Sequence, residues 1–216
     1  MSNYYKGALN VSTDLKLRAL VSATARGTTV NPVFRLWQVI TTAFFPTAEG
    51  YASYLKVPQS KKDDIPDCEV FGVKRVLCGA ENPEEWLQKE ILVVFCLDAK
   101  SDIPEHWNGL KEDLEPYMLQ IPHSDNSNGP PGRFVAVVMG RRVKMFAWKT
   151  GKTQSIEQLH DEPLDMSAPE DANKVADWLN HFKDETWDYT KWEPAKDSDF
   201  KYEPQHEPRP MINIPS

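Results

Sequence analysis

The sequence predicts an α/β sandwich, in which a central mixed sheet of four or five strands has helices on both sides. Residues 91–97 (ILVVFCL) are continuously apolar, as in a central strand that is buried on both faces. Apolar side chains recur at helical spacing over residues 104–120. Residues 134–139 and 143–148 flank a Gly-Arg-Arg turn, and this pattern predicts a β-hairpin.

The other elements follow from local signals along the chain. Ser12 or Asp14 is expected to cap a helix that ends at Arg26, and Asn31 to cap a second helix that ends before Pro46. The remaining expectations are strands over 50–57 and 67–77, a polar connection over 80–89, a loop over 122–132 and a helix over 169–182. The chain thus divides into an N-terminal arm (1–30), an α/β domain (31–183) and an acidic, aromatic, proline-rich tail (184–216).

Composition excludes several classes of protein. A net charge of −7 and a pI near 5.3 argue against a generally basic nucleic-acid binder but leave room for a local basic groove. Three cysteines without CxxC spacing argue against a disulfide framework and a thiolate zinc site. The longest apolar run is far shorter than the roughly 20 residues of a membrane helix, and the first thirty residues hold no signal-peptide pattern. We therefore expect a cytoplasmic or nuclear protein that is neither secreted nor membrane-bound.

Two acids and a lysine stand where expected strands begin and end. Asp67 follows Pro66 at the start of one strand, and Asp98 and Lys100 end the central strand. Residues two apart in a strand point to the same side, so Asp98 and Lys100 are expected to project together. Antiparallel pairing of the two strands brings Asp67 to the same edge of the sheet. Paired carboxylates suit Mg²⁺, which can activate water against a phosphodiester, while a lysine stabilises the charge that develops.

This order of elements resembles the PD-(D/E)XK nuclease superfamily, and most closely the uncharacterised fungal proteins of that fold. The matching text is PVFRLWQVITTAFFPTAEGY, IPDCEVFGV, ILVVFCLDAK and RFVAVVMGRRVKMFAW, which together cover roughly residues 32–150. The resemblance implies a nuclease that requires Mg²⁺ or Mn²⁺. It also implies that Asp67 and Asp98 bind the metal and that Lys100 is the catalytic lysine.

The chain departs from the family pattern at two positions. The first helix of the family often supplies a Glu to the metal site, whereas this helix offers only the uncharged Gln38. Asp98 stands where Glu is commoner and reaches less far by one methylene. These departures favour an alternative, a catalytically inactive protein of the same fold that acts as a binding or regulatory module for a protein partner. A homodimer formed through the tail is a third hypothesis.

Each candidate residue also has a plain structural interpretation. Asp67 after Pro66 fits a turn, and Asp98 and Lys100 fit the point where a buried strand meets water. Gln120 lies where some members of the fold carry an accessory polar residue, and it equally fits a solvated helix end. The remaining candidates, Arg141 and Arg142, can contact a phosphate backbone, although exposed charge is common in a hairpin turn.

Overall fold

The computed structural model describes residues 9, 14–26, 29–56, 68–78, 86–120, 133–149 and 155–185. The helices are α1 (Leu15–Arg26), α2 (Asn31–Phe44), α3 (Pro104–Gln120) and α4 (Pro169–Glu185), with 3₁₀ turns η1 (Thr47–Glu49) and η2 (Ala99–Ser101). The strands are β1 (Tyr51–Lys56), β2 (Cys68–Cys78), β3 (Trp86–Leu97), β4 (Arg133–Met139), β5 (Arg142–Lys149), β6 (Ser155–Gln158) and β7 (Leu164–Asp165). The predicted α/β class is confirmed.

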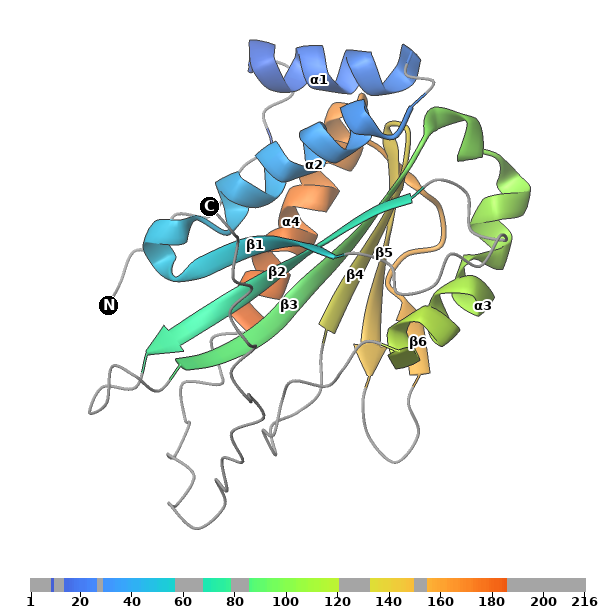
Figure 1. Ribbon diagram of the computed structural model, residues 1–216. Helices are drawn as coiled ribbons and strands as arrows, with labels where there is room; N and C mark the ends of the chain where they lie inside the picture. The colour runs from blue at the N-terminus through green and yellow to red at the C-terminus, as the bar shows by residue number, and fades with distance from the viewer. Residues whose placement is uncertain are drawn as a thin grey trace, which may run out of the picture.

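The strands form one mixed sheet in the order β1-β2-β3-β4-β5-β6, with β7 also paired to β5 (Figure 1). Neighbouring strands are antiparallel except β3 and β4, which are parallel because α3 carries the chain back between them. The expected count of about four or five strands is wrong, since the described residues form a sheet of seven. The short strands β6 and β7, which pair with β5, were not predicted.

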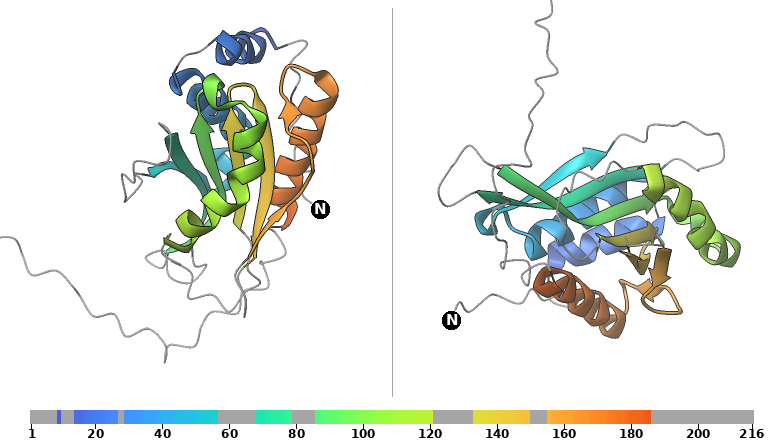
Figure 2. Two further views of the ribbon diagram at one scale, coloured as in Figure 1. Left: turned by 90° about the vertical axis from the view of Figure 1, so that its right-hand side faces the viewer. Right: turned by 90° about the horizontal axis from the view of Figure 1, so that it is seen from below.

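Helices cover both faces of the sheet, with α2 and α4 on one side and α3 on the other (Figure 2). Strand β3 contributes side chains to the core on each face of the sheet. Its side chains Leu92, Val94 and Cys96 face the α2 and α4 layer, whereas Val93, Phe95 and Leu97 face α3. All six are buried, which confirms the prediction of a central strand covered on both faces.

The helix boundaries agree closely with the sequence signals. The Asp14 carboxylate accepts the backbone N–H groups of Lys16 and Leu17 at 2.9 and 3.1 Å, and so caps α1. Pro32 lies in the first turn of α2, but the N-cap residue is Val30 instead of the predicted Asn31. The helix α3 has the predicted bounds, whereas α4 continues three residues past Phe182 to Glu185.

Strand β3 is longer than predicted. It begins at Trp86, so residues 86–89, expected as part of a polar connection, pair with β2 instead. The pairing shifts by one residue between Val73 and Lys74, and this irregularity lets the polar half of β3 continue the strand. The predicted loop over 122–132 lies outside the described residues. Within the described part of the chain, no helix is both long and apolar enough to span a membrane.

Candidate functional site

The paired strands β2 and β3 end next to the two predicted acids in the sequence. The two strands are antiparallel, as expected, and the last pair of their ladder places Cys68 opposite Leu97. Asp98 directly follows Leu97 in the chain, and Asp67 directly precedes Cys68. Asp67 itself lies outside the described residues. The register therefore brings the peptide-bonded neighbours of both acids together at one edge of the sheet.

Asp98 is a capping residue as well as a candidate ligand. Its Oδ1 accepts hydrogen bonds from the backbone N–H and the hydroxyl of Ser101, both at 3.0 Å. Strand β3 ends at Leu97, and Ala99–Ser101 form the 3₁₀ turn η2. We expected Asp98 and Lys100 to point to the same side because residues two apart in a strand do so. That reason does not apply, since both residues lie beyond the end of the strand.

The capped arrangement leaves two groups available for chemistry. Among the described residues, no hydrogen bond to Asp98 Oδ2 is made, and the Asp98 side chain is partly exposed. Lys100 is exposed and forms no ion pair within the described ranges. One carboxylate oxygen is thus fixed by the turn, while the other oxygen and the ammonium remain open to a metal or a substrate.

The turn between β4 and β5 packs against η2. Gly140 adopts the left-handed conformation, with φ of 58°, and its N–H donates to the carbonyl oxygen of Leu97 at 3.5 Å. A Cβ atom at Gly140 would lie 3.1 Å from both Cα and Cβ of Ala99. The carbonyl oxygen of Thr24, near the end of α1, lies 3.8 Å from the same point. The candidate site is therefore bordered by the β4–β5 turn and the end of α1.

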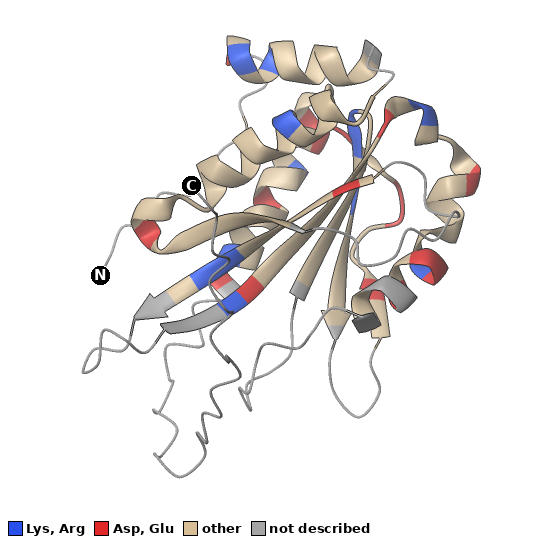
Figure 3. Cartoon of the chain, viewed as in Figure 1, with Lys and Arg blue, Asp and Glu red and all other residues tan. Residues whose placement is uncertain are grey.

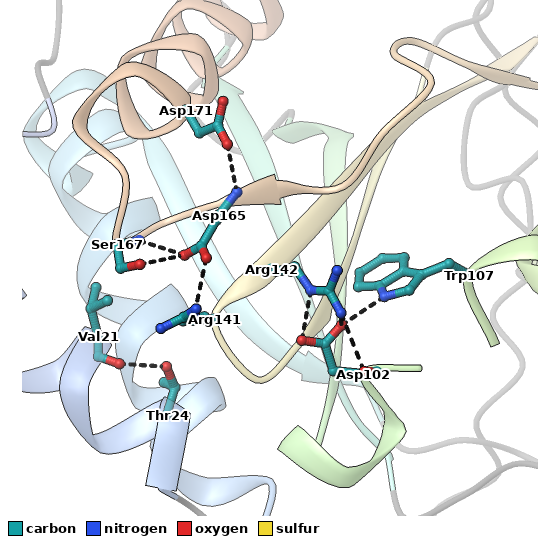
Figure 4. Close-up of polar contacts among 9 residues, drawn as sticks. All are labelled: Val21, Thr24, Asp102, Trp107, Arg141, Arg142, Asp165, Ser167 and Asp171. Atoms are coloured by element: carbon teal, nitrogen blue, oxygen red, sulfur yellow. Dashed lines mark hydrogen bonds and ion pairs between the residues drawn. The ribbon is translucent and has the colours of Figure 1, made fainter. Parts of the chain in front are cut away.

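Both arginines of this turn have carboxylate partners (Figure 4). Arg141 Nε lies 3.0 Å from Asp165 Oδ2, and Arg142 Nε donates to Asp102 Oδ2 at 2.7 Å. Arg142 Nη2 also donates to the Asp102 carbonyl oxygen at 3.2 Å. The predicted contact of these arginines with phosphate thus has to compete with two intramolecular ion pairs.

The structure does not bring the two candidate glutamines, Gln38 and Gln120, to the site. Gln38 lies on the exposed side of α2, whose buried face carries Val33, Leu36, Trp37, Ile40, Thr41 and Phe44. Gln120 is the last residue of α3, and its side chain is not among those that the structure describes. Neither helix position adds an acidic ligand to the edge that carries Asp98.

Basic residues do not gather around Asp98. Figure 3 shows Lys and Arg positions and Asp and Glu positions scattered over the described elements. The register places Lys74, Arg75 and Lys89 on the parts of β2 and β3 away from the Cys68–Leu97 pair. A groove for a nucleic-acid backbone is expected to collect Lys and Arg. Around η2, by contrast, Lys100, Arg141 and Arg142 are matched in number by Asp98, Asp102 and Asp165.

The partly buried Cys68 and the buried Cys96 do not add a reactive group. Burial raises the pKa of the Cys68 thiol to about 12, and burial likewise raises the pKa of Cys96. Both thiols stay protonated at neutral pH and are poor nucleophiles and metal ligands. Among the described residues, no three His, Cys, Asp or Glu side chains come together as a metal site. Asp67 is not one of the described residues.

Comparison with protein families, with curated proteins and with solved structures gave no match. The site therefore has to be judged on its own geometry.

Sequence reasoning missed two residues that shape this site. Ser101, buried, donates twice to Asp98, and Asp102 accepts from both Arg142 and Trp107. The spacing Asp98-x-x-Ser101 is a local capping signal that could have indicated the turn. The Arg142–Asp102 pair joins residues 40 positions apart, and no local sequence pattern predicts it.

Proposed function

We propose that the chain is a metal-dependent phosphodiesterase of the PD-(D/E)XK type that acts on nucleic acid. The observation that supports the proposal is the β2–β3 register, which ends with Cys68 opposite Leu97, the residues bonded to Asp67 and Asp98 in the chain. The element order α2, β1, β2, β3, α3, β4, β5 also agrees with the order that carries the resemblance.

The available atoms fit a small divalent cation. Asp98 Oδ2 and the carboxylate of Asp67 are hard oxygen donors, the type that Mg²⁺ and Mn²⁺ prefer, with water completing the shell. When bound, the metal would polarise the phosphodiester and acidify water. Lys100 would orient the attacking water and stabilise charge on the phosphate oxygens. The attacking water would give up a proton to solvent and its oxygen would bond to phosphorus as the ester P–O bond breaks, and the leaving oxygen would take up a proton from solvent.

The test uses substitutions that leave the turn intact. Asp98→Asn keeps a side-chain oxygen that can accept from Ser101, so the cap is retained while the negative charge is lost. Calorimetry with Mg²⁺ and Mn²⁺ should show micromolar to millimolar binding to the wild type. We expect Asp98→Asn and Asp67→Asn to lower that affinity by about 10- to 100-fold.

Cleavage assays then test the lysine. Labelled single- and double-stranded DNA and RNA should be cut by the wild type with metal, and Lys100→Gln should lower kcat by about 100-fold. Asp113→Asn and Lys111→Gln, exposed positions on α3, are matched controls for the loss of each charge. Metal binding that survives Asp98→Asn unchanged would contradict the proposal.

A second candidate function, a binding module without catalysis, is favoured by the charge distribution. The named charges around η2 show no basic excess, and Arg141 and Arg142 are both ion-paired to acids. Asp98 would then act only as the cap of η2. A wild-type chain that binds no metal at millimolar concentration would support this function and direct the search to protein partners.

A further inference from the structure

The segment from Asp98 to Ile103 is held at several points by short-range hydrogen bonds. Asp98 caps η2 through Ser101, and the N–H of Asp102 donates to the carbonyl oxygen of Ala99 at 3.3 Å. The N–H of Ile103 donates to the carbonyl oxygen of Ser101 at 2.9 Å. Lys100, in the middle of this segment, is therefore placed by the residues on either side of it.

Asp102 anchors the far end of the segment to the sheet and to α3 (Figure 4). Arg142 on β5 contacts both oxygens of the Asp102 carboxylate. Its Nε donates to Oδ2, and its Nη2 lies 2.5 Å from Oδ1. The indole Nε1 of Trp107 donates to the same Oδ1 at 2.7 Å. The guanidinium carbon lies 6.0 Å from the centre of the Trp107 ring, within range of a cation–π interaction.

This pair is less exposed and makes more contacts than an ordinary surface ion pair. The Asp102 side chain retains 17% of its exposure and the Arg142 side chain 35%. Two nitrogens of the planar guanidinium contact the two carboxylate oxygens, and one of them also reaches the Asp102 backbone. Such a fork fixes both distance and orientation, which a lysine ammonium cannot reproduce fully.

We propose that Arg142 is a positioning residue that acts through Asp102 to hold Lys100 and Asp98 in their working geometry. This inference rests on the proposed function for its catalytic consequence. It assigns Arg142 a task different from a phosphate contact, because its donors point at a carboxylate of its own chain. The two tasks predict different kinetics: a phosphate contact sets KM, whereas positioning of Lys100 sets kcat.

The experiment compares Arg142→Gln, Arg142→Lys and the control Lys174→Gln. The control removes an exposed ion pair to Asp171 on α4, away from η2. Cleavage of labelled DNA and RNA with Mg²⁺ should show kcat lowered by about 10- to 100-fold in Arg142→Gln, with KM within about twofold of the wild type. Arg142→Lys should recover part of kcat, and Lys174→Gln should match the wild type.

Hydrogen exchange gives a readout that does not require activity. The backbone amides of Ser101, Asp102 and Ile103 should exchange faster in Arg142→Gln than in the wild type or in Lys174→Gln. If Arg142→Gln does not fold, Asp102→Asn takes its place, since its side-chain oxygen can still accept from Trp107.

The outcomes separate this inference from the proposed function. A raised KM with unchanged kcat, or unchanged exchange of the three amides, would overturn the positioning role. Faster exchange together with a wild type that cleaves no substrate would support the anchoring of the segment and reject the nuclease function instead.

Discussion

At the scale of single residues, the imidazole of His160 accepts a backbone hydrogen bond from β5. Its Nε2 accepts the N–H of Met145 at 3.0 Å, and its Nδ1 lies 2.7 Å from the carbonyl oxygen of Glu162. A neutral ring with its proton on Nδ1 satisfies both contacts, whereas a protonated ring cannot accept from Met145. The hydrogen bond therefore requires the uncharged form.

The environment lowers the pKa of His160 below its ordinary value. Burial is the main cause, and the charge of Lys144 adds to it. The carbonyl of Glu162 and the carboxylates of Asp171 and Asp161 act in the opposite direction but do not outweigh burial. The unfolded chain therefore binds a proton at this position at a higher pH than the folded chain does.

This difference predicts a loss of stability in acid. Because the pKa is depressed on folding, the contribution of His160 is fully present above about pH 6.5, the ordinary histidine value. It declines as the pH falls from there toward the folded-state pKa. Urea unfolding of the wild type and of His160→Gln between about pH 5 and pH 8 measures it: the stability advantage of the wild type should shrink as the solution becomes more acidic. A difference that is constant over this range would show that the ring does not titrate on unfolding.

At the scale of elements, the β4–β5 turn is fitted to η2 by the absence of a side chain. Gly140 has a positive φ, and a methyl group there would approach two atoms of Ala99, one of them in the backbone. A left-handed conformation costs an L-residue about 1 kcal/mol, and the overlap adds about 1–2 kcal/mol because η2 must move.

We therefore expect Gly140→Ala to lower the free energy of unfolding by about 2–3 kcal/mol. The matched control is Gly109→Ala within α3, where the nearest atom to the new methyl group is Asp113 Oδ2 at 3.9 Å. A helical glycine replaced by alanine should gain up to about 1 kcal/mol. Denaturant unfolding of both variants decides the matter, and an equal response would mean that the turn and η2 do not pack as described.

The same turn shows where sequence reasoning ends. The hairpin itself was predictable, because two apolar runs flank a glycine and two arginines. The partners of those arginines were not, since Asp102 and Asp165 lie far along the chain and meet them only after the sheet has formed. The start of β3 at Trp86 and the 3₁₀ turn after Asp98 were also missed, because an apolar run shows that a strand exists but not how far polar residues extend it or which conformation follows it.

At the scale of the whole molecule, burial decided which elements could be predicted. Strand β3 is covered on both faces, and its unbroken apolar run predicts it from the sequence. Strands β6 and β7 each bury only one large side chain, Ile156 and Leu164, so they leave no alternating pattern. The candidate site was predictable only in part. The sequence indicated its residue types, but its geometry depends on a turn and on long-range ion pairs that the sequence does not indicate.

The double coverage of β3 also predicts how the molecule unfolds. Val93 packs in the layer with α3 and Val94 in the layer with α2 and α4, and neither retains exposure to solvent. Each Val→Ala substitution removes two methyl groups and leaves a cavity, at a cost of about 2 kcal/mol. Because one strand forms the floor of both layers, neither layer can persist once β3 leaves the sheet.

Val93→Ala and Val94→Ala should therefore each shift one common unfolding transition to lower denaturant, with an unchanged slope. Leu55→Ala on β1, where the side chain is 64% exposed, is the control and should change stability by less than about 0.5 kcal/mol. Far-UV circular dichroism and tryptophan fluorescence should give coincident curves for all three variants. Separate transitions in the two probes would mean that the α3 layer and the α2–α4 layer unfold independently, and that β3 does not couple them.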